Sequence, residues 1–179
     1  MSNILTGKKV SLRPATLDDR ASIFQWLAHS NLTKEMIGPP KYPDSEIPTW
    51  EAFIQDYAEF YFDGSQPLNG RCFIIEKDGL GIGQINYNEI DISSNSTFLD
   101  IWLSDRKYTG KGYGTEAIEL LCNFLKVKFG CKEIMLCPSK RNTVAIQAYE
   151  KAGFIMTDRI LSESERDYID NVVMVKNVE

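Results

Sequence analysis

The stretch of sequence that decides the fold is Asp105-Arg-Lys-Tyr-Thr-Gly-Lys-Gly-Tyr-Gly-Thr-Glu-Ala117. It follows segment 96–104, whose alternating apolar and polar residues are typical of a strand, and it runs into a segment whose apolar residues recur at helical spacing. Gly110, Gly112 and Gly114 leave the backbone N–H groups at the start of that helix unobstructed. Free N–H groups and the positive end of a helix dipole bind phosphate, so the stretch predicts a site for a phosphate-bearing ligand.

Two common phosphate-binding motifs do not fit this loop. A Walker loop requires Ser or Thr after its lysine, but Lys111 is followed by Gly112. The dinucleotide fingerprint would need its third glycine at position 115, which is Thr115. The remaining alternative is a strand-to-helix turn without a ligand. Three glycines exceed what a turn needs, because each weakens a helix start by about 0.5–1 kcal/mol relative to alanine.

A second motif, N-x-x-A-x-x-x-Y-x-x-x-G-F, follows a short apolar strand at residues 133–138. Its fixed positions are Asn142, Ala145, Tyr149, Gly153 and Phe154. Asn142 can cap a helix that Gly153 ends. Ala145 and Tyr149 are four residues apart and therefore lie on one face of this helix.

Together the two motifs resemble those of the GNAT superfamily of acetyl-coenzyme A-dependent acyltransferases. In that family the first loop cradles the pyrophosphate and the second helix packs beside the pantetheine arm. The resemblance implies acetyl-coenzyme A as co-substrate and no metal. The contacts it implies with the cofactor come from Leu103, Thr109, Gly110, Lys111, Gly112, Tyr113, Gly114, Thr115, Asn142, Ala145 and Tyr149. This chain departs from the family at Thr109, where the family has Gln or Arg, but both glycines needed for backbone binding are present.

The rest of the chain resembles the same fold. Strands are expected at 8–13, 71–77, 81–90, 96–104, 133–138, 154–160 and 169–176. A capping box at Thr16–Asp19 predicts a first helix, and an aromatic stripe from Trp50 to Tyr61, interpreted as core, predicts a second. The proline-rich segment 34–48 between them is expected to be a loop. The fold class is therefore α/β (mixed α+β): one domain over residues 1–179, with a mostly antiparallel sheet of about seven strands and helices on both faces.

Length and composition agree with one globular domain. The 179 residues, 43% hydrophobic and 25% charged, suffice for one core but not for two ordinary domains. No apolar stretch reaches the roughly 20 residues of a membrane span, and a signal-peptide core is missing, so a cytoplasmic location is expected. Four cysteines without a C-x-x-C pair predict neither a zinc site nor disulfides. The single histidine, His29, argues against a Ser-His-Asp hydrolase.

Charge is distributed unevenly along the chain. Residues 1–105 hold 15 Asp and Glu against 8 Lys and Arg, a net charge of −7, whereas residues 106–179 hold 10 against 12, a net charge of +2. We expect the C-terminal part to bind an anionic cofactor and the acidic N-terminal part to favour a cationic acceptor such as an amine. The alternative is an ordinary acidic surface. An acidic chain without a basic stripe argues against nucleic-acid binding.

The reaction itself indicates which residues are needed. An acceptor amine with a pKa of about 10.4 is protonated at neutral pH, so a base must free its lone pair. Asp100, in the strand before the phosphate loop, is the candidate base, although it could instead be a strand carboxylate paired with a lysine. Tyr149 resembles the family tyrosine that protonates the departing thiolate. Glu89 is a second candidate for holding the amine.

A narrower resemblance concerns the aminoglycoside 6′-N-acetyltransferases. They carry an aspartate eleven residues before the loop lysine, as Asp100 and Lys111 do here, but commonly have Asp-Pro where this chain has Cys137-Pro138. The predicted function is acetyl transfer to a primary amine of a small cationic acceptor, with an aminoglycoside as one candidate. Alternatives are a protein N-terminal or lysine acetyltransferase of the ribosomal-protein type, and a non-catalytic acyl-coenzyme A binder. We expect a monomer or homodimer whose partner is a small amine rather than nucleic acid or membrane.

Overall fold

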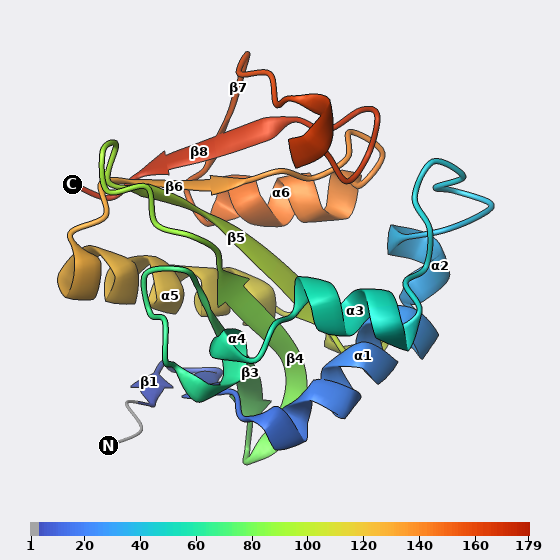
Figure 1. Cartoon of the computed structure of the whole chain (residues 1–179), viewed down its shortest axis with the longest axis horizontal. Coiled ribbons are helices and arrows are strands. Elements are labelled where there is room, and N and C mark those ends of the chain that lie inside the picture. Colours follow the sequence, from blue (N-terminus) through green and yellow to red (C-terminus); the bar gives the residue numbers. More distant parts are fainter. Residues whose placement is uncertain (1–3) are drawn as a thin grey trace.

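A continuous eight-stranded sheet runs through the computed structural model, which describes residues 4–179 (Figure 1). Its strands are β1 (Leu5–Thr6), β2 (Ser11–Pro14), β3 (Arg71–Lys77), β4 (Leu80–Tyr87), β5 (Ser96–Leu103), β6 (Glu133–Leu136), β7 (Ile155–Thr157) and β8 (Val173–Asn177). The helices are α1 (Arg20–His29), α2 (Thr33–Met36), α3 (Trp50–Asp56), α4 (Phe60–Asp63), α5 (Tyr113–Phe129) and α6 (Thr143–Lys151).

The strand order β1-β2-β3-β4-β5-β6-β8-β7 contains one parallel pair, β5 with β6, and all other neighbours are antiparallel. The parallel pairing covers only Ser96–Phe98 of β5 and Glu133–Met135 of β6. β5 then continues to Leu103, while β6 ends at Leu136. The sheet therefore opens beyond Phe98, and within residues 4–179 no strand pairs with β5 on that side.

Side-chain alternation along the strands divides the core between the two faces of the sheet. Phe73 and Ile75 of β3 pack with α5 residues such as Leu121 in the larger buried cluster. The intervening Ile74 belongs to a second cluster, with residues of α1, α3 and α4 that include Phe53. Figure 1 shows α5 on one side of the sheet and α1, α3 and α4 on the other. The predicted mixed sheet with helices on both faces is confirmed.

The helix that begins at the glycine-rich stretch is the longest in the described chain. α5 starts after Gly112 (φ +81°) and ends at Gly130 (φ +69°), both in the left-handed region that favours glycine. The predicted cap of α6 is also observed, because Asn142 Oδ1 accepts a hydrogen bond from the Ala145 N–H at 3.1 Å. Local sequence signals thus place both helices that follow the two motifs.

Several predicted elements differ in the structure. The sheet has eight strands rather than about seven, because the two-residue β1 pairs with β2. Segment 34–48 is not all loop, since α2 reaches Met36. The expected helix from Trp50 to Tyr61 is divided into α3 and α4, because Tyr57 leaves the helical region (φ −97°, ψ +68°). β4 stops at Tyr87, before the expected end at 90.

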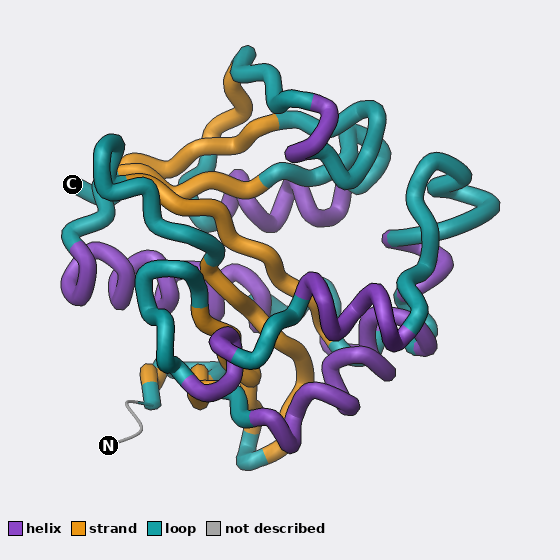
Figure 2. Tube along the Cα trace, viewed as in Figure 1, coloured by secondary structure: helices purple, strands orange, loops and turns teal. Residues whose placement is uncertain are grey.

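The last two strands are also shorter than expected, and the chain between them leaves the sheet. β7 ends at Thr157 and β8 begins only at Val173, so residues 158–172 form a long loop that contains one short 3-10 turn. In Figure 2 the loop of residues 37–49 is teal, and the loop of residues 158–172 is teal apart from its 3-10 turn. None of the described helices combines the length and apolar composition of a membrane span.

Candidate active site

The loop before α5 presents a row of free backbone donors. None of the N–H groups from Gly110 to Thr115 donates a hydrogen bond to any residue within 4–179, and the first helical N–H with an acceptor is that of Glu116. Gly110 (φ +70°) and Gly112 (φ +81°) adopt left-handed backbone conformations that favour glycine, and neither has a side chain that could cover the free N–H groups. Free N–H groups at the positive end of a helix of 17 residues fit a phosphate or pyrophosphate group.

Two charged side chains, Glu116 of α5 and Lys9 of the turn between β1 and β2, connect this loop to the N-terminal segment. The Glu116 carboxylate accepts hydrogen bonds from the N–H groups of Lys8, Lys9 and Val10 at 2.7–3.1 Å. Burial alone would raise the pKa of Glu116, but these donors hold it below its ordinary value. Lys9 Nζ donates to the Lys111 carbonyl at 3.1 Å and thus adds a positive charge beside the glycines. The sequence carried no signal for Lys9, because this contact spans 102 residues.

The remaining predicted loop residues are placed as follows. Thr109, where the family has a longer polar side chain, donates its hydroxyl to the Arg106 carbonyl at 2.7 Å. The Lys111 side chain is exposed, and Tyr113 packs partly against the larger core cluster. Leu103, the last residue of β5, also packs against that cluster and does not line the cavity described next.

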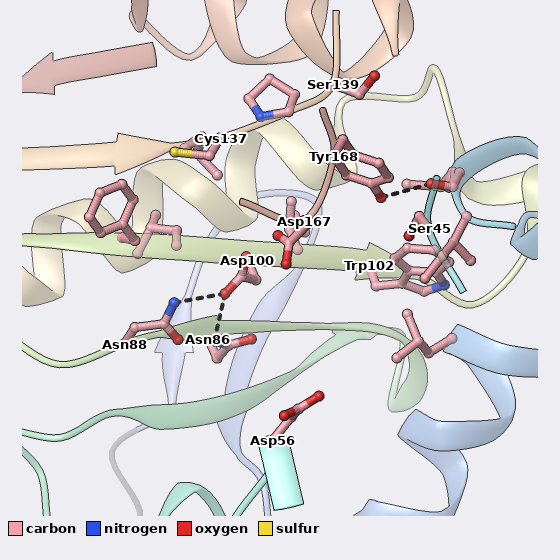
Figure 3. Close-up of a pocket in the computed structure, with 18 of the residues that line it drawn as sticks. Ser45, Asp56, Asn86, Asn88, Asp100, Trp102, Cys137, Ser139, Asp167 and Tyr168 are labelled. Atoms are coloured by element: carbon pink, nitrogen blue, oxygen red, sulfur yellow. Dashed lines mark hydrogen bonds between the residues drawn. The ribbon is translucent and has the colours of Figure 1, made fainter. Parts of the chain in front are cut away.

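A cavity of about 640 Å³, the central cavity, lies where β5 and β6 separate (Figure 3). Alternate residues of two strands make its floor: Gln84 and Asn86 on β4 pair with Trp102 and Asp100 on β5. Asn88 extends the row of amides by one more alternation beyond the end of β4. The floor is therefore polar, unlike the opposite face of the same strands, which carries the larger core cluster.

Asp100 is held at the centre of this floor by two amides. Asn88 Nδ2 donates to Asp100 Oδ2 at 2.9 Å, and Asn86 Nδ2 donates to the same oxygen at 3.3 Å. Tyr61 in turn donates its hydroxyl to Asn88 Oδ1 at 3.1 Å, which orients that amide. The Asp100 side chain is exposed to the solvent of the cavity, and the protein atoms around it partly desolvate its carboxylate. Burial raises the pKa of Asp100, and the two amides partly oppose this shift.

Tyr149 of α6 lines the same cavity as Asp100, so the structure brings the two predicted catalytic residues together. Its hydroxyl has no hydrogen-bond partner among residues 4–179. Burial, with the charge of Asp100 as a smaller contribution, raises the pKa of Tyr149, so the phenol is protonated at neutral pH and can donate. Asn142, the cap of α6, also lines the cavity, whereas Ala145 does not.

The cavity wall is strongly acidic. Its carboxylates are Glu46, Asp56, Asp100, Glu165 and Asp167, and the described lining contains no lysine, arginine or histidine. Burial, together with the charges of Asp100 and Asp56, raises the pKa of Asp167 to about 6. Both parts of the chain contribute carboxylates, which differs from the expectation that the N-terminal part alone would shape this side. Such a wall attracts a ligand with several positive charges.

The sequence did not predict that two tyrosines and a cysteine would line the cavity, or that Glu89 would lie outside it. Tyr57 and Tyr61 pack against the second core cluster, as the interpretation of the aromatic stripe as core expects, but they also line the cavity. Gln84 Nε2 donates to the Tyr57 hydroxyl at 3.2 Å. Cys137 also lines the cavity, and burial raises its pKa to about 12, so its thiol stays neutral. Glu89 is exposed, two residues beyond β4, and is not part of the cavity wall. No group of three or more metal-ligating side chains occurs in the described chain.

Comparison with sequence families and known proteins agrees with this geometry. Residues 9–155 match the family model described as an acetyltransferase (GNAT) domain. The chain is 25% identical over 158 residues to spermidine N(1)-acetyltransferase of Escherichia coli K12, covering 88% of this chain and 79% of that protein. It is 32% identical over 92 residues to spermine/spermidine N(1)-acetyltransferase of Bacillus subtilis 168, covering 51% of this chain and 56% of that protein.

Solved structures share the fold. AAC(6')-Ib in complex with ribostamycin and coenzyme A superposes with a TM-score of 0.75 at 24% identity, covering 96% of this chain and 94% of that chain. Spermidine N-acetyltransferase from Vibrio cholerae in complex with coenzyme A and spermine gives a TM-score of 0.72 at 18% identity, with 96% of both chains covered. At these identities the likeness concerns the fold alone.

Proposed function

The chain belongs to the GNAT acetyltransferase family, and we propose that it transfers the acetyl group of acetyl-coenzyme A to a primary amine of a small acceptor with several positive charges. The observation that carries this proposal is the wall of the central cavity, which holds five carboxylates and, in its described lining, no basic side chain. A low-dielectric cleft lined by one sign of charge concentrates ligands of the opposite sign. A polyamine or an aminoglycoside has this charge pattern.

On the donor side, the pyrophosphate of acetyl-coenzyme A would bind the free N–H groups of residues 110–115. Lys9 and Lys111 would add positive charge to that site, since both lie on the same exposed loop surface. The opening between β5 and β6 leads from this loop to the cavity, which supports a path for the pantetheine arm. Leu103, Asn142 and Ala145 remain proposed contacts along it.

On the acceptor side, Asp100 would accept a proton from the ammonium group or hold that group beside the thioester. The neutral amine nitrogen then forms a bond to the acetyl carbonyl carbon, and the bond from that carbon to sulfur breaks. Tyr149, whose raised pKa keeps it protonated, would give its proton to the departing thiolate. The nitrogen loses one further proton as the amide forms, and this proton restores the Tyr149 phenol. The products are the N-acetylated amine and coenzyme A with a free thiol.

Among polycations, a polyamine is the better-supported acceptor. The sequence relatives named above are spermidine or spermine acetyltransferases, and the match to the Escherichia coli protein covers 79% of that protein's length. Cys137 is uncharged where the aminoglycoside enzymes commonly have an aspartate, which removes one contact that a bulkier polycation would need. A cytoplasmic location and a monomeric or homodimeric state also remain predictions.

A panel of amines with acetyl-coenzyme A tests the proposal. It comprises spermidine, spermine, kanamycin, a monoamine, a peptide with a free α-amine and lysine, and glutamate as an amine of opposite charge. Thiol release and the mass of the product are measured for each. We expect turnover with polycations and none with glutamate. Turnover with the peptide alone would identify a protein acetyltransferase, and cofactor binding without thiol release from any amine would identify a non-catalytic binder.

A further inference from the structure

Two loops from distant parts of the chain form one side of the central cavity. Residues 37–49 connect α2 to α3 and contribute Ser45 and Glu46 to the wall. Residues 158–172 connect β7 to β8 and contribute Glu165, Asp167 and Tyr168. Neither loop belongs to a strand of the sheet, and only the end of the second loop is paired, through the isolated bridge between Ser139 and Asn171. Other contacts must hold them in place against the entropy of free loops.

A single guanidinium group joins the two loops. Arg141 donates from Nη1 and Nη2 to the two carboxylate oxygens of Asp44 at 2.7 and 2.9 Å, and from Nη1 to the Lys41 carbonyl at 3.0 Å. The same side chain donates from Nη2 and Nε to the two oxygens of Asp170 at 2.8 and 3.1 Å. Arg141 thus forms a two-pronged ion pair with each loop, a geometry that lysine cannot reproduce.

Further contacts converge on the same point. The Arg141 guanidinium lies 4.6 Å from the ring centroid of Tyr42 and 5.9 Å from that of Tyr168, and the two rings are 5.2 Å apart. Tyr168 donates its hydroxyl to the Met36 carbonyl at 2.8 Å, which Figure 3 marks with a dashed line. The Ile169 N–H donates to Asp44 at 3.1 Å. Arg141 Nε also donates a hydrogen bond to the Ser139 hydroxyl, which lies in neither loop.

We propose that Arg141 is a positioning residue for the acceptor: it clamps the 37–49 and 158–172 loops together and thereby holds Glu46 and Asp167 in the wall that faces Asp100. Arg141 itself does not line the cavity, although its neighbours Ser139 and Asn142 do. The inference rests on the proposed function, because it has the loop carboxylates bind those positive charges of the acceptor that do not react at Asp100. Ordering these loops before binding removes an entropic cost that the acceptor would otherwise bear.

The test compares acceptors of different charge in Arg141→Ala and Arg141→Lys. For spermidine we expect KM to rise about tenfold in Arg141→Ala, while kcat and the KM for acetyl-coenzyme A change less than about twofold. For a monoamine, which needs only Asp100, KM should change less than about twofold. Arg141→Lys keeps the charge but cannot bridge both carboxylates, so an intermediate KM is expected. Asp44→Asn, which alters neither α6 nor its cap, should reproduce the effect.

Arg13 provides a matched control. It donates to both oxygens of Asp19 at 2.9 and 3.0 Å and to Glu76 at 3.0 Å, and its side chain is 31% exposed, against 28% for Arg141. It does not line the cavity. Arg13→Ala should lower the melting temperature about as much as Arg141→Ala while leaving the KM for spermidine unchanged. An equal rise of KM in both variants, or equal losses for spermidine and the monoamine, would overturn the clamp.

The clamp can also be tested without turnover. Hydrogen exchange is measured on wild type, Arg141→Ala and Arg13→Ala, using peptides that cover residues 37–49 and 158–172. We expect faster exchange of both loops only in Arg141→Ala, beginning with the Ile169 N–H that Asp44 binds. Unchanged exchange would refute the clamp even if the enzyme acetylates polyamines. Faster exchange in an enzyme that acetylates no polycation would refute the proposed acceptor and leave the clamp supported.

Discussion

The donor end and the acceptor end of the site are built in different ways. The loop before α5 is one continuous stretch of chain whose free N–H groups follow from its glycines and from the start of the helix. The central cavity draws its wall from the loops of residues 37–49 and 158–172, from residues of α1, α2, α3, α4 and α6, and from the open edge between β5 and β6. One end is therefore encoded in local backbone conformation, and the other in contacts between residues as far apart as Asp44 and Arg141.

The two ends also carry opposite charge. The helix dipole, Lys9 and Lys111 make the donor end positive, whereas five carboxylates make the cavity negative. Under the proposed function, an anionic cofactor and a cationic acceptor would be drawn to separate places that meet near Asp100 and Tyr149. This separation predicts that substitutions in the loop before α5 change the affinity for acetyl-coenzyme A and leave the KM for the amine nearly unchanged. Substitutions in the cavity wall should have the reverse effect.

The largest effect is expected where the two ends meet. Tyr149→Phe should lower kcat by about 10²–10⁴-fold, because the departing thiolate loses its proton donor, while acetyl-coenzyme A affinity changes little. Steady-state kinetics and calorimetry measure the two quantities. Tyr87→Phe is the matched control, since Tyr87 is a buried tyrosine of the opposite sheet face that donates to the Pro67 carbonyl. Wild-type turnover in Tyr149→Phe would mean that Tyr149 only packs in the cavity.

Asp100→Asn should affect the acceptor alone. It keeps the shape but removes charge and basicity, so kcat/KM for the amine should fall roughly 10²-fold while cofactor affinity is unchanged. Part of the loss should return at higher pH, where more of the amine is already neutral. The measurement is the pH profile of kcat/KM, with Glu89→Gln beside it. If only Glu89→Gln moves the profile, the base lies outside the central cavity and Asp100 is structural.

Gly112→Val should affect the donor alone. A Cβ at this position would stand beside Lys9 Nζ, and a branched side chain would crowd the free N–H groups. We expect acetyl-coenzyme A affinity to fall at least about tenfold, or about 1.4 kcal/mol, by calorimetry. Gly79→Val controls for backbone strain, because Gly79 has φ +79° and open space around it. Equal affinities in the two folded variants would remove the loop from the site.

The smallest effect concerns pH at the acceptor end. Asp167, with its pKa raised to about 6, becomes charged as pH rises from 5 to 7 and only then attracts an ammonium group. The KM for spermidine should therefore fall roughly fivefold over this range, the factor that corresponds to about 1 kcal/mol. Asp167→Asn should remove this part of the pH dependence and leave the KM for acetyl-coenzyme A unchanged. If the KM for spermidine still falls between pH 5 and 7 in Asp167→Asn, a group other than Asp167 causes the pH dependence.

Prediction from the sequence succeeded where the signal was local. The strand, glycine loop and helix around Gly112 and the Asn142 cap were predicted from spacing, and both are observed. The aromatic stripe from Trp50 to Tyr61 was read as one helix facing the core, but the chain breaks at Tyr57. Tyr57 and Tyr61 then reach the cavity floor, where their hydroxyls meet amides of the distant β4 region. Periodicity cannot show such a break, because the partners lie 27 residues away.

The sequence by itself indicated the family and the glycine-rich loop before α5, because both depend on residues that are neighbours along the chain, and the mixed sheet followed from the resemblance to that family. It also singled out Asp100 and Tyr149, although not the space between them. Only the tertiary structure decided the acceptor side. Carboxylates from both parts of the chain, the amides that hold Asp100 and the Arg141 contacts come together only when the sheet opens between β5 and β6 and two loops close beside it. Charge and hydrogen-bond complementarity between distant segments is a property of the folded chain, which local spacing does not encode.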